Sequence, residues 1–235
     1  MPPSGEFLSL ATRKRLLQCS LLAGACFFSE MAAAESSLRA ARTLNPPNLD
    51  GRLDDAVWKN APSSVAFTQK FPTAGSPPTE PTAVRVLYDD HALYIGIDCT
   101  QRLAPVVQRL SRRDRAVEAD TLTVSLDTRR DRTTAFEFSV NAAGVLGDSI
   151  RYNDTDVSED WDEIWDARAA KTASGWSAEL MIPLRVLRFD QLPIQDWGLQ
   201  IRRYVSQRQE TDEWAFIPRD AAGEVSRYGR LVGLE

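Results

Sequence analysis

The clearest fold signal in this chain is the stretch Gly175-Trp176-Ser177-Ala178-Glu179-Leu180-Met181-Ile182-Pro183. Side chains of an extended chain point alternately to its two sides, so every second residue shares one face. Here that face is wholly apolar and consists of Trp176, Ala178, Leu180 and Ile182. A helix would spread these four side chains around its axis because its period is 3.6 residues. The stretch therefore predicts a β-strand with one face in a core.

Runs rich in β-branched and aromatic residues surround this strand and are separated by turn residues. The turn Thr172–Gly175 predicts a hairpin with the run before it, and the run 197–207 repeats the apolar alternation. The other predicted strands cover 83–88, 92–98, 121–127, 135–141, 146–152, 163–171 and 214–217. Two segments, 53–60 and 184–187, are predicted to form one or two short helices. Many short strands joined by turns predict an all-β fold, an antiparallel β-sandwich of jelly-roll type.

Composition and charge favour a globular protein and disfavour nucleic-acid-binding and helical membrane proteins. The 235 residues are 43% hydrophobic and 26% charged, which suits a globular protein with a core. The net charge of −5 disfavours nucleic acid as a partner, because an acidic surface repels the phosphate backbone. No apolar run reaches the roughly 20 residues that a transmembrane helix needs.

Residues 1–34 have the pattern of a secretory signal peptide. A basic segment, Arg13-Lys14-Arg15, precedes a short apolar segment at 16–28, and Ala32-Ala33-Ala34 follows as a small-residue cleavage site. This order predicts export to the periplasm or the cell surface, with a mature chain that begins at Glu35. Residues 35–235 contain no internal repeat or long linker and are predicted to form one domain.

Lipidation is an alternative way of processing the same leader, because Ala23-Gly24-Ala25-Cys26 is similar to a lipoprotein signal. Either cleavage removes Cys19, and cleavage after Ala34 removes Cys26 as well. Cys99 then has no cysteine to pair with, so the exported domain must rely on its core or on bound ions for stability.

Five stretches, in this order along the chain, resemble a known family. They are Leu49–Trp58, Val86–Gly96, Phe138–Val145, Gly175–Leu184, and Leu187-Arg188-Phe189 with Trp197-Gly198. Together they are similar to the family 9 carbohydrate-binding module-like domain, over nearly all of residues 35–235. Among such proteins, the chain looks like those of bacteria in which this domain precedes an outer-membrane β-barrel. The resemblance implies a sandwich fold, binding of an oligo- or polysaccharide, and structural calcium.

Aromatic side chains are the first candidates for sugar contact, because an apolar sugar face stacks on an aromatic ring. Trp58, Trp176 and Trp197 lie among apolar neighbours and are predicted to be core residues. Trp161 and Trp165 lie instead in the acidic segment Asp154–Asp166, where carboxylates could accept bonds from sugar hydroxyls. We expect these two residues to bind carbohydrate, with a structural role at the edge of the sandwich as the alternative.

Trp214 is the third candidate for sugar contact. It follows Glu213 and alternates with Phe216, a pattern that a core position would also give.

The same acidic segment is the candidate metal site. Asp154, Asp156 and Asp160 have the alternation of an oxygen-ligand calcium loop. An EF-hand is excluded, because Glu159 and Trp165 stand where that loop needs glycine and a bidentate glutamate. A looser calcium site and a solvated acidic loop both remain open for these aspartates.

Catalytic residues have little support in the sequence. His91, the single histidine, lies in a predicted hairpin turn, which disfavours histidine-based triads and histidine-ligated zinc. A pair of carboxylates in a glycoside hydrolase is not excluded, but no spacing singles one out. We therefore expect a non-catalytic glycan-binding module, with two alternatives: an accessory domain of an outer-membrane β-barrel assembly without sugar affinity, and a glycoside hydrolase.

Overall fold

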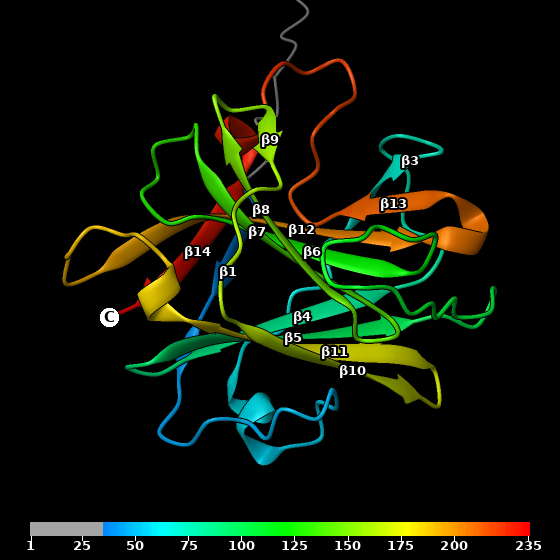
Figure 1. Ribbon diagram of the computed structural model, residues 1–235, viewed down its shortest axis with the longest axis horizontal. Helices are drawn as coiled ribbons and strands as arrows, with labels where there is room; N and C mark the ends of the chain where they lie inside the picture. The colour runs from blue at the N-terminus through cyan, green and yellow to red at the C-terminus, as the bar shows by residue number, and fades with distance from the viewer. Residues whose placement is uncertain (1–34) are drawn as a thin grey trace, which may run out of the picture. The chain divides into compact units, whose positions relative to one another are not determined.

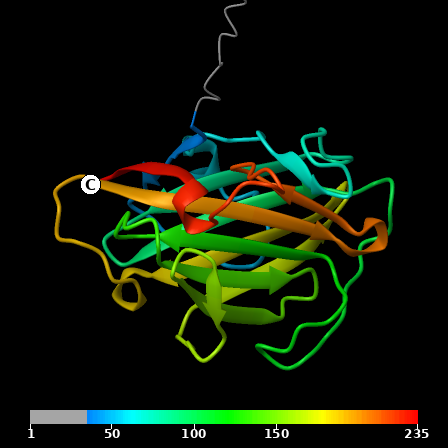
Figure 2. The same cartoon turned by 90° about the horizontal axis from the view of Figure 1, so that it is seen from above.

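Two β-sheets packed face to face make up residues 35–235, the part of the chain that the computed structural model describes (Figure 1, Figure 2). The nine-stranded sheet has the order β1 (Ser37–Arg39), β14 (Gly229–Leu234), β12 (Gln195–Val205), β6 (Thr121–Asp127), β7 (Ala135–Asn141), β8 (Leu146–Tyr152) and β9 (Asp156–Ser158). Its remaining strands are β13 (Glu210–Glu213), which pairs with β12, and β3 (Thr68–Phe71), which pairs with β13. The five-stranded sheet has the order β10 (Asp166–Thr172), β11 (Gly175–Pro183), β5 (Ala92–Thr100), β4 (Thr82–Tyr88) and β2 (Ala41–Arg42).

Helical structure in the described residues is limited to four single 3₁₀ turns. These are η1 (Ala56–Asn60), η2 (Leu184–Val186), η3 (Ser206–Arg208) and η4 (Val225–Arg227). Within residues 35–235, no helix has the length and apolarity that crossing a bilayer would require. The predicted signal peptide, with Cys19 and Cys26, lies outside the described residues, and Cys99 is buried.

The predicted sandwich is confirmed, and most of its strands lie where the sequence places them. β6, β7 and β8 have the predicted limits, and η1 and η2 lie within the predicted helical segments. The predicted strand 214–217 is wrong, because the strand in this part of the chain is β13, which ends at Glu213. Five short strands (β1, β2, β3, β9 and β14) were not predicted. Two of them form the parallel pairs β1–β14 and β2–β4, whereas the other pairs are antiparallel.

The core lies between the two sheets and confirms the alternation in β11. Trp176, Ala178, Leu180 and Ile182 are all 0% exposed. They belong to one apolar cluster with inward side chains of the other sheet, among them Val124, Phe138, Leu199 and Ile201.

The N-terminal segment covers the outer side of the five-stranded sheet, below it in Figure 1. Trp58 of η1 packs there against Leu87 and Tyr94. The carboxylate of Glu179, 0% exposed on β11, accepts hydrogen bonds from the backbone N–H groups of Asp50 and Gly51 at 2.9 Å each. It also accepts one from the Trp58 indole at 2.8 Å. The first and fourth of the five sequence stretches are therefore joined through Glu179.

Gly51 has a backbone requirement at this junction. Its φ of +88° lies in the left-handed region, and a Cβ there would come within 2.7 Å of the Ala169 carbonyl carbon. Glycine is therefore the residue that lets the segment approach β10 closely enough to reach Glu179.

Candidate functional site

The outer side of the nine-stranded sheet is lined by polar side chains from β6, β7, β8 and β12. In β7, Phe136 and Phe138 point into the core, so Glu137 and Ser139 point outward. Their antiparallel partners across the strand pairs include Ser125 and Thr123 on β6 and Ser149 and Gly147 on β8. We call this surface the polar face. The outward position of Glu137 and Ser139 could have been found from the sequence, because these two residues alternate with the core residues of β7.

Two hollows open on the polar face and adjoin each other. One, of about 340 Å³, lies over β6, β7 and β8, and the other, of about 370 Å³, lies over β12 and β13. Thr123, Glu137 and Arg151 line both hollows. An extended ligand could therefore run across five strands without leaving the surface.

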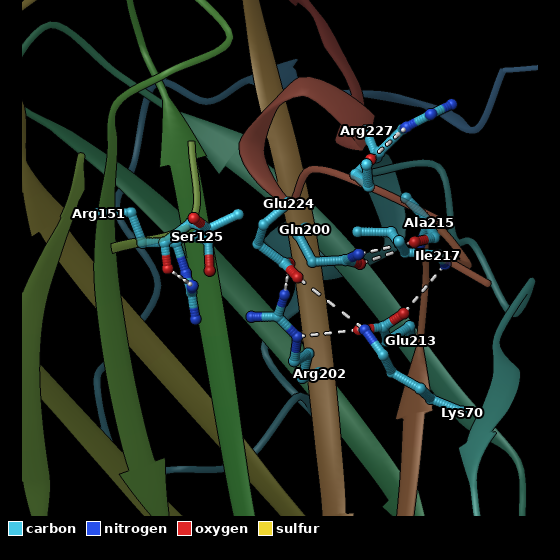
Figure 3. A network of polar contacts seen from close by, with 12 residues as sticks. Lys70, Ser125, Arg151, Gln200, Arg202, Glu213, Ala215, Ile217, Glu224 and Arg227 are labelled. Carbon is cyan, nitrogen blue, oxygen red and sulfur yellow. Dashed lines mark hydrogen bonds and ion pairs between the residues drawn. The ribbon is translucent and has the colours of Figure 1, made fainter. Parts of the chain in front are cut away.

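A network of ion pairs forms the floor of the second hollow (Figure 3). Arg202 of β12 donates to Glu213 at 3.0 Å and pairs with Glu224. Lys70 donates to the same Glu213 at 2.8 Å, and Arg151 donates to Glu137 at 2.7 Å. Three cations therefore balance three carboxylates, and the side chains are held in fixed positions for a polar ligand.

The electrostatics of this floor disfavour acid catalysis by Glu137. Burial alone would raise its pKa, but the guanidiniums of Arg151 and Arg202 and the Ser125 hydroxyl outweigh burial and lower that pKa. A glycosidase acid needs the opposite, a carboxyl group that keeps its proton near neutral pH. The arrangement is suited to binding, because ionised side chains make strong hydrogen bonds to hydroxyl groups.

None of the three tryptophans predicted to bind sugar lines these hollows. Trp165 and Trp214 are only 4% and 2% exposed, and the Trp214 indole donates to Ser64 at 2.9 Å. Neither ring presents a face to solvent, which argues against a sugar contact by these two residues. Trp165 alternates with the buried Ala167, and this alternation was the signal for a core position.

Trp161 is half-buried and covers the edge of the core. Its ring lies 5.0 Å from that of Phe136 and 5.6 Å from that of Phe138, centroid to centroid. One part of the ring stays accessible, so the predicted sugar contact of Trp161 stays a prediction. Trp161 and Trp165 both contact Phe138, so the structure brings these two together and leaves Trp214 apart.

The predicted calcium ligands do not converge on one point. Asp154 is used to hold the segment around η4: its carboxylate accepts bonds from the backbone N–H groups of Glu224 and Ser226 and from the Ser226 hydroxyl, each at 2.9 Å. Asp156 and Asp160 are exposed. This arrangement does not fit a calcium ion shared by the three aspartates, because the carboxylate of Asp154 is already occupied.

A different set of carboxylates comes together beside the first hollow. Asp114, Asp148 and Asp162 have oxygen atoms within 4.8 Å of one another, the one such group of three or more potential metal ligands in residues 35–235. The Arg113 guanidinium pairs with all three, most closely with Asp148 at 2.6 Å. One guanidinium therefore offsets part of the negative charge of the three carboxylates.

Comparison with solved structures shows where this fold occurs. Two structures of a carbohydrate binding module family 9 from Caldicellulosiruptor kristjanssonii, in complex with glucose and with cellotriose, are 16% and 15% identical to this chain. Both have a TM-score of 0.58, and each alignment covers 85% of this chain. The alignments cover 97% of the chain in the glucose complex and 95% of the chain in the cellotriose complex. A protein of Bacteroides uniformis, 12% identical, reaches a TM-score of 0.65 over 86% of this chain and 100% of its own.

No curated protein matches the chain significantly. A family model does match: the carbohydrate family 9 binding domain-like model aligns with residues 49–232, well over half of the sequence. These residues include all strands from β3 to β13 and the first four residues of β14, and thus the whole polar face. The protein belongs to the carbohydrate family 9 binding domain-like family.

Proposed function

We propose that this protein is a non-catalytic module that binds an oligo- or polysaccharide across its polar face. The observation that carries the proposal is the polar face itself, where hydroxyl groups lie beside prearranged ion pairs over two adjoining hollows. Sugar hydroxyls both donate and accept, so they suit a surface that offers carboxylates, guanidiniums and hydroxyls together. Family membership and the sugar complexes of the Caldicellulosiruptor module support the same ligand class.

Thr123 offers the sharpest test of this site, since it lines both hollows and is half-buried on the outer side of β6. Thr123→Val keeps the shape of the side chain and removes its hydroxyl. We expect a two- to tenfold loss of affinity, roughly the free energy of one hydrogen bond, with an unchanged melting temperature. Isothermal titration with glucose, cellotriose and any ligand from a glycan array measures this loss.

Thr172→Val is the matched control, because it makes the same chemical change at the end of β10, in the other sheet. Its affinity should equal that of the unmodified protein. Equal sugar affinities of the Thr123→Val variant and the unmodified protein would contradict a binding site on the polar face. If the protein binds no sugar on a glycan array, the result would favour the accessory-domain alternative instead.

Export is part of the same proposal, supported by the signal-peptide pattern of residues 1–34. N-terminal sequencing of the protein purified from its native host should start at Glu35. A lipidated Cys26 would indicate export by the lipoprotein route. Protein that retains Met1 in the cytoplasm would contradict export.

The biological setting of the binding event is a further proposal that rests on the sequence resemblance. Binding by an exported module would serve polysaccharide degradation by holding an associated glycoside hydrolase on its substrate. The alternative setting is an accessory domain of an outer-membrane β-barrel assembly. The two differ in what the gene encodes next to this domain, a hydrolase or a barrel.

A further inference from the structure

A third hollow is lined by residues of η2 and of the segment that follows it. In Figure 1 this segment lies near the C-terminus of the chain. The volume of the hollow is about 620 Å³, and it shares no lining residue with the two hollows of the polar face. Its walls are residues 184–191, the turn that follows β6, and the turn between β4 and β5. We call it the η2 hollow.

Three arginines line the η2 hollow: Arg129, Arg185 and Arg188. All three are exposed, and none of them forms an ion pair with another residue of the 35–235 region. Each guanidinium presents five N–H donors in a planar fork and stays charged at any physiological pH. Three such groups line one hollow of a chain whose net charge is −5, and this local positive charge favours an anion there.

The backbone that carries these arginines is anchored on three sides. The Leu184 N–H donates to the His91 carbonyl at 2.8 Å, and the Leu187 N–H donates to the Leu184 carbonyl at 3.1 Å. The Thr128 hydroxyl donates to the Arg188 carbonyl at 2.6 Å, which joins the turn after β6 to the segment after η2. The backbone that carries the arginines is therefore fixed, so binding has only their side chains to order.

Apolar side chains from the same segment form part of the lining. Leu187 is buried, and the half-buried Phe189 packs its ring against Trp197 at a centroid distance of 5.3 Å. A fixed aromatic ring beside cationic groups suits a ligand that has both an apolar face and a negative charge.

Two carboxylates also line the hollow and limit what the ligand can be. Asp90 is held by Arg42 at 2.5 Å, so its charge is compensated, while Asp190 is exposed. Both can accept hydrogen bonds from hydroxyl groups. The lining therefore offers donors for an anion and acceptors for hydroxyls in one place.

We propose that the η2 hollow binds an acidic saccharide, whose ring carboxylate is held by Arg129, Arg185 and Arg188 while the sugar ring lies against Phe189. That the ligand is a saccharide rests on the function proposed above; that it is an anion rests on the arginines. Arginine binds a carboxylate through two parallel, charge-assisted hydrogen bonds, whereas the hydroxyl groups of a neutral sugar carry no charge.

The test uses the whole protein and three acidic probes, the trimers of galacturonate, glucuronate and mannuronate. Each trimer is titrated calorimetrically beside its carboxyl-reduced counterpart, which differs only by the charged group. We expect at least one acidic trimer to bind ten- to a hundredfold more tightly than its neutral counterpart, with an affinity that falls as salt is added. The double variant Arg185→Ala with Arg188→Ala should lose most of this difference.

Two further variants keep the result interpretable. Arg188→Lys keeps the charge but loses the planar fork, so it should bind with intermediate affinity. Arg52→Ala removes an exposed arginine of the N-terminal segment and should bind as the unmodified protein does. Melting curves of all variants check that the fold is retained.

Three outcomes would overturn the proposal: no preference for any acidic trimer, an equal loss in Arg52→Ala, or displacement of the trimer by inorganic phosphate at the same concentration. The polar face is tested separately. Thr123→Val should leave acidic-trimer binding unchanged, and the double arginine variant should leave binding at the polar face unchanged. Failure at one site can therefore be distinguished from failure at the other.

Discussion

Replacing Trp176 with alanine is expected to lower the free energy of unfolding by about 3–5 kcal/mol. The side chain is 0% exposed at the centre of the apolar cluster between the two sheets. Its strand, β11, lies between β10 and β5, where Trp176 is opposite Lys171 and Cys99. Backbone pairing on both sides keeps the surroundings from collapsing into the space left behind, so most of the cavity would persist. Urea denaturation followed by circular dichroism measures the loss.

Trp176→Phe is the matched control for this experiment. The Trp176 indole N–H has no hydrogen-bond partner in residues 35–235, so phenylalanine removes volume without removing a hydrogen bond. Its loss of stability should be well under half that of the alanine variant. Trp161→Ala, at the half-buried edge of the core, should also cost less. Coincident unfolding curves for Trp176→Ala and the unmodified protein would contradict the packing of β11.

Replacing Glu179 with alanine is expected to cost at least about 3 kcal/mol, for a different reason. The change leaves the backbone N–H groups of Asp50 and Gly51 and the Trp58 indole without an acceptor. Each buried donor without a partner costs about 1–3 kcal/mol, and the segment around η1 can recover part of this by detaching toward water. Urea denaturation measures the total loss. Hydrogen exchange at the amides of Asp50 and Gly51 should show local detachment as a loss of protection.

A double-mutant cycle separates the charge of Glu179 from its role as an acceptor. Burial raises the pKa of Glu179, although the hydrogen bonds from the Trp58 indole and the Gly51 amide act to lower it. Keeping this carboxylate ionised in the folded protein therefore costs free energy. Glu179→Gln removes the charge and keeps one acceptor oxygen, but its NH₂ group would face a donor. Trp58→Phe removes the indole donor, so the two changes together should cost less than their sum. Strict additivity would contradict the hydrogen bond between these two side chains.

Much of the sandwich could be predicted because its signals are local. In β6 and β7 the alternation of apolar and polar residues continues to the turn residues, and the strands end there. The short strands β1 and β2 carry no such pattern. They pair with β14 and β4, so Ser37 lies opposite Arg230 and Ala41 opposite Leu87, and only the completed sheets supply those partners.

The candidate site was harder to predict, because a side chain's neighbours in space differ from its neighbours in the sequence. Trp161 and Trp165 stand in an acidic segment, which suggested exposure, yet both pack against Phe138 of β7. The spacing of Asp154 in the sequence is typical of a calcium ligand. In the folded protein its carboxylate instead accepts hydrogen bonds from the backbone N–H groups of Glu224 and Ser226.

What the sequence determines by itself is the sandwich and its core, because alternation and turn chemistry act over a few residues. The tertiary structure alone assembles the polar face, its ion pairs and the η2 hollow. The partners in the polar face, such as Lys70, Glu137 and Arg202, come from strands far apart in the chain, and the arginines of the η2 hollow come from two separate turns. Charge pairing across such distances depends on strand order and register, which no local pattern encodes.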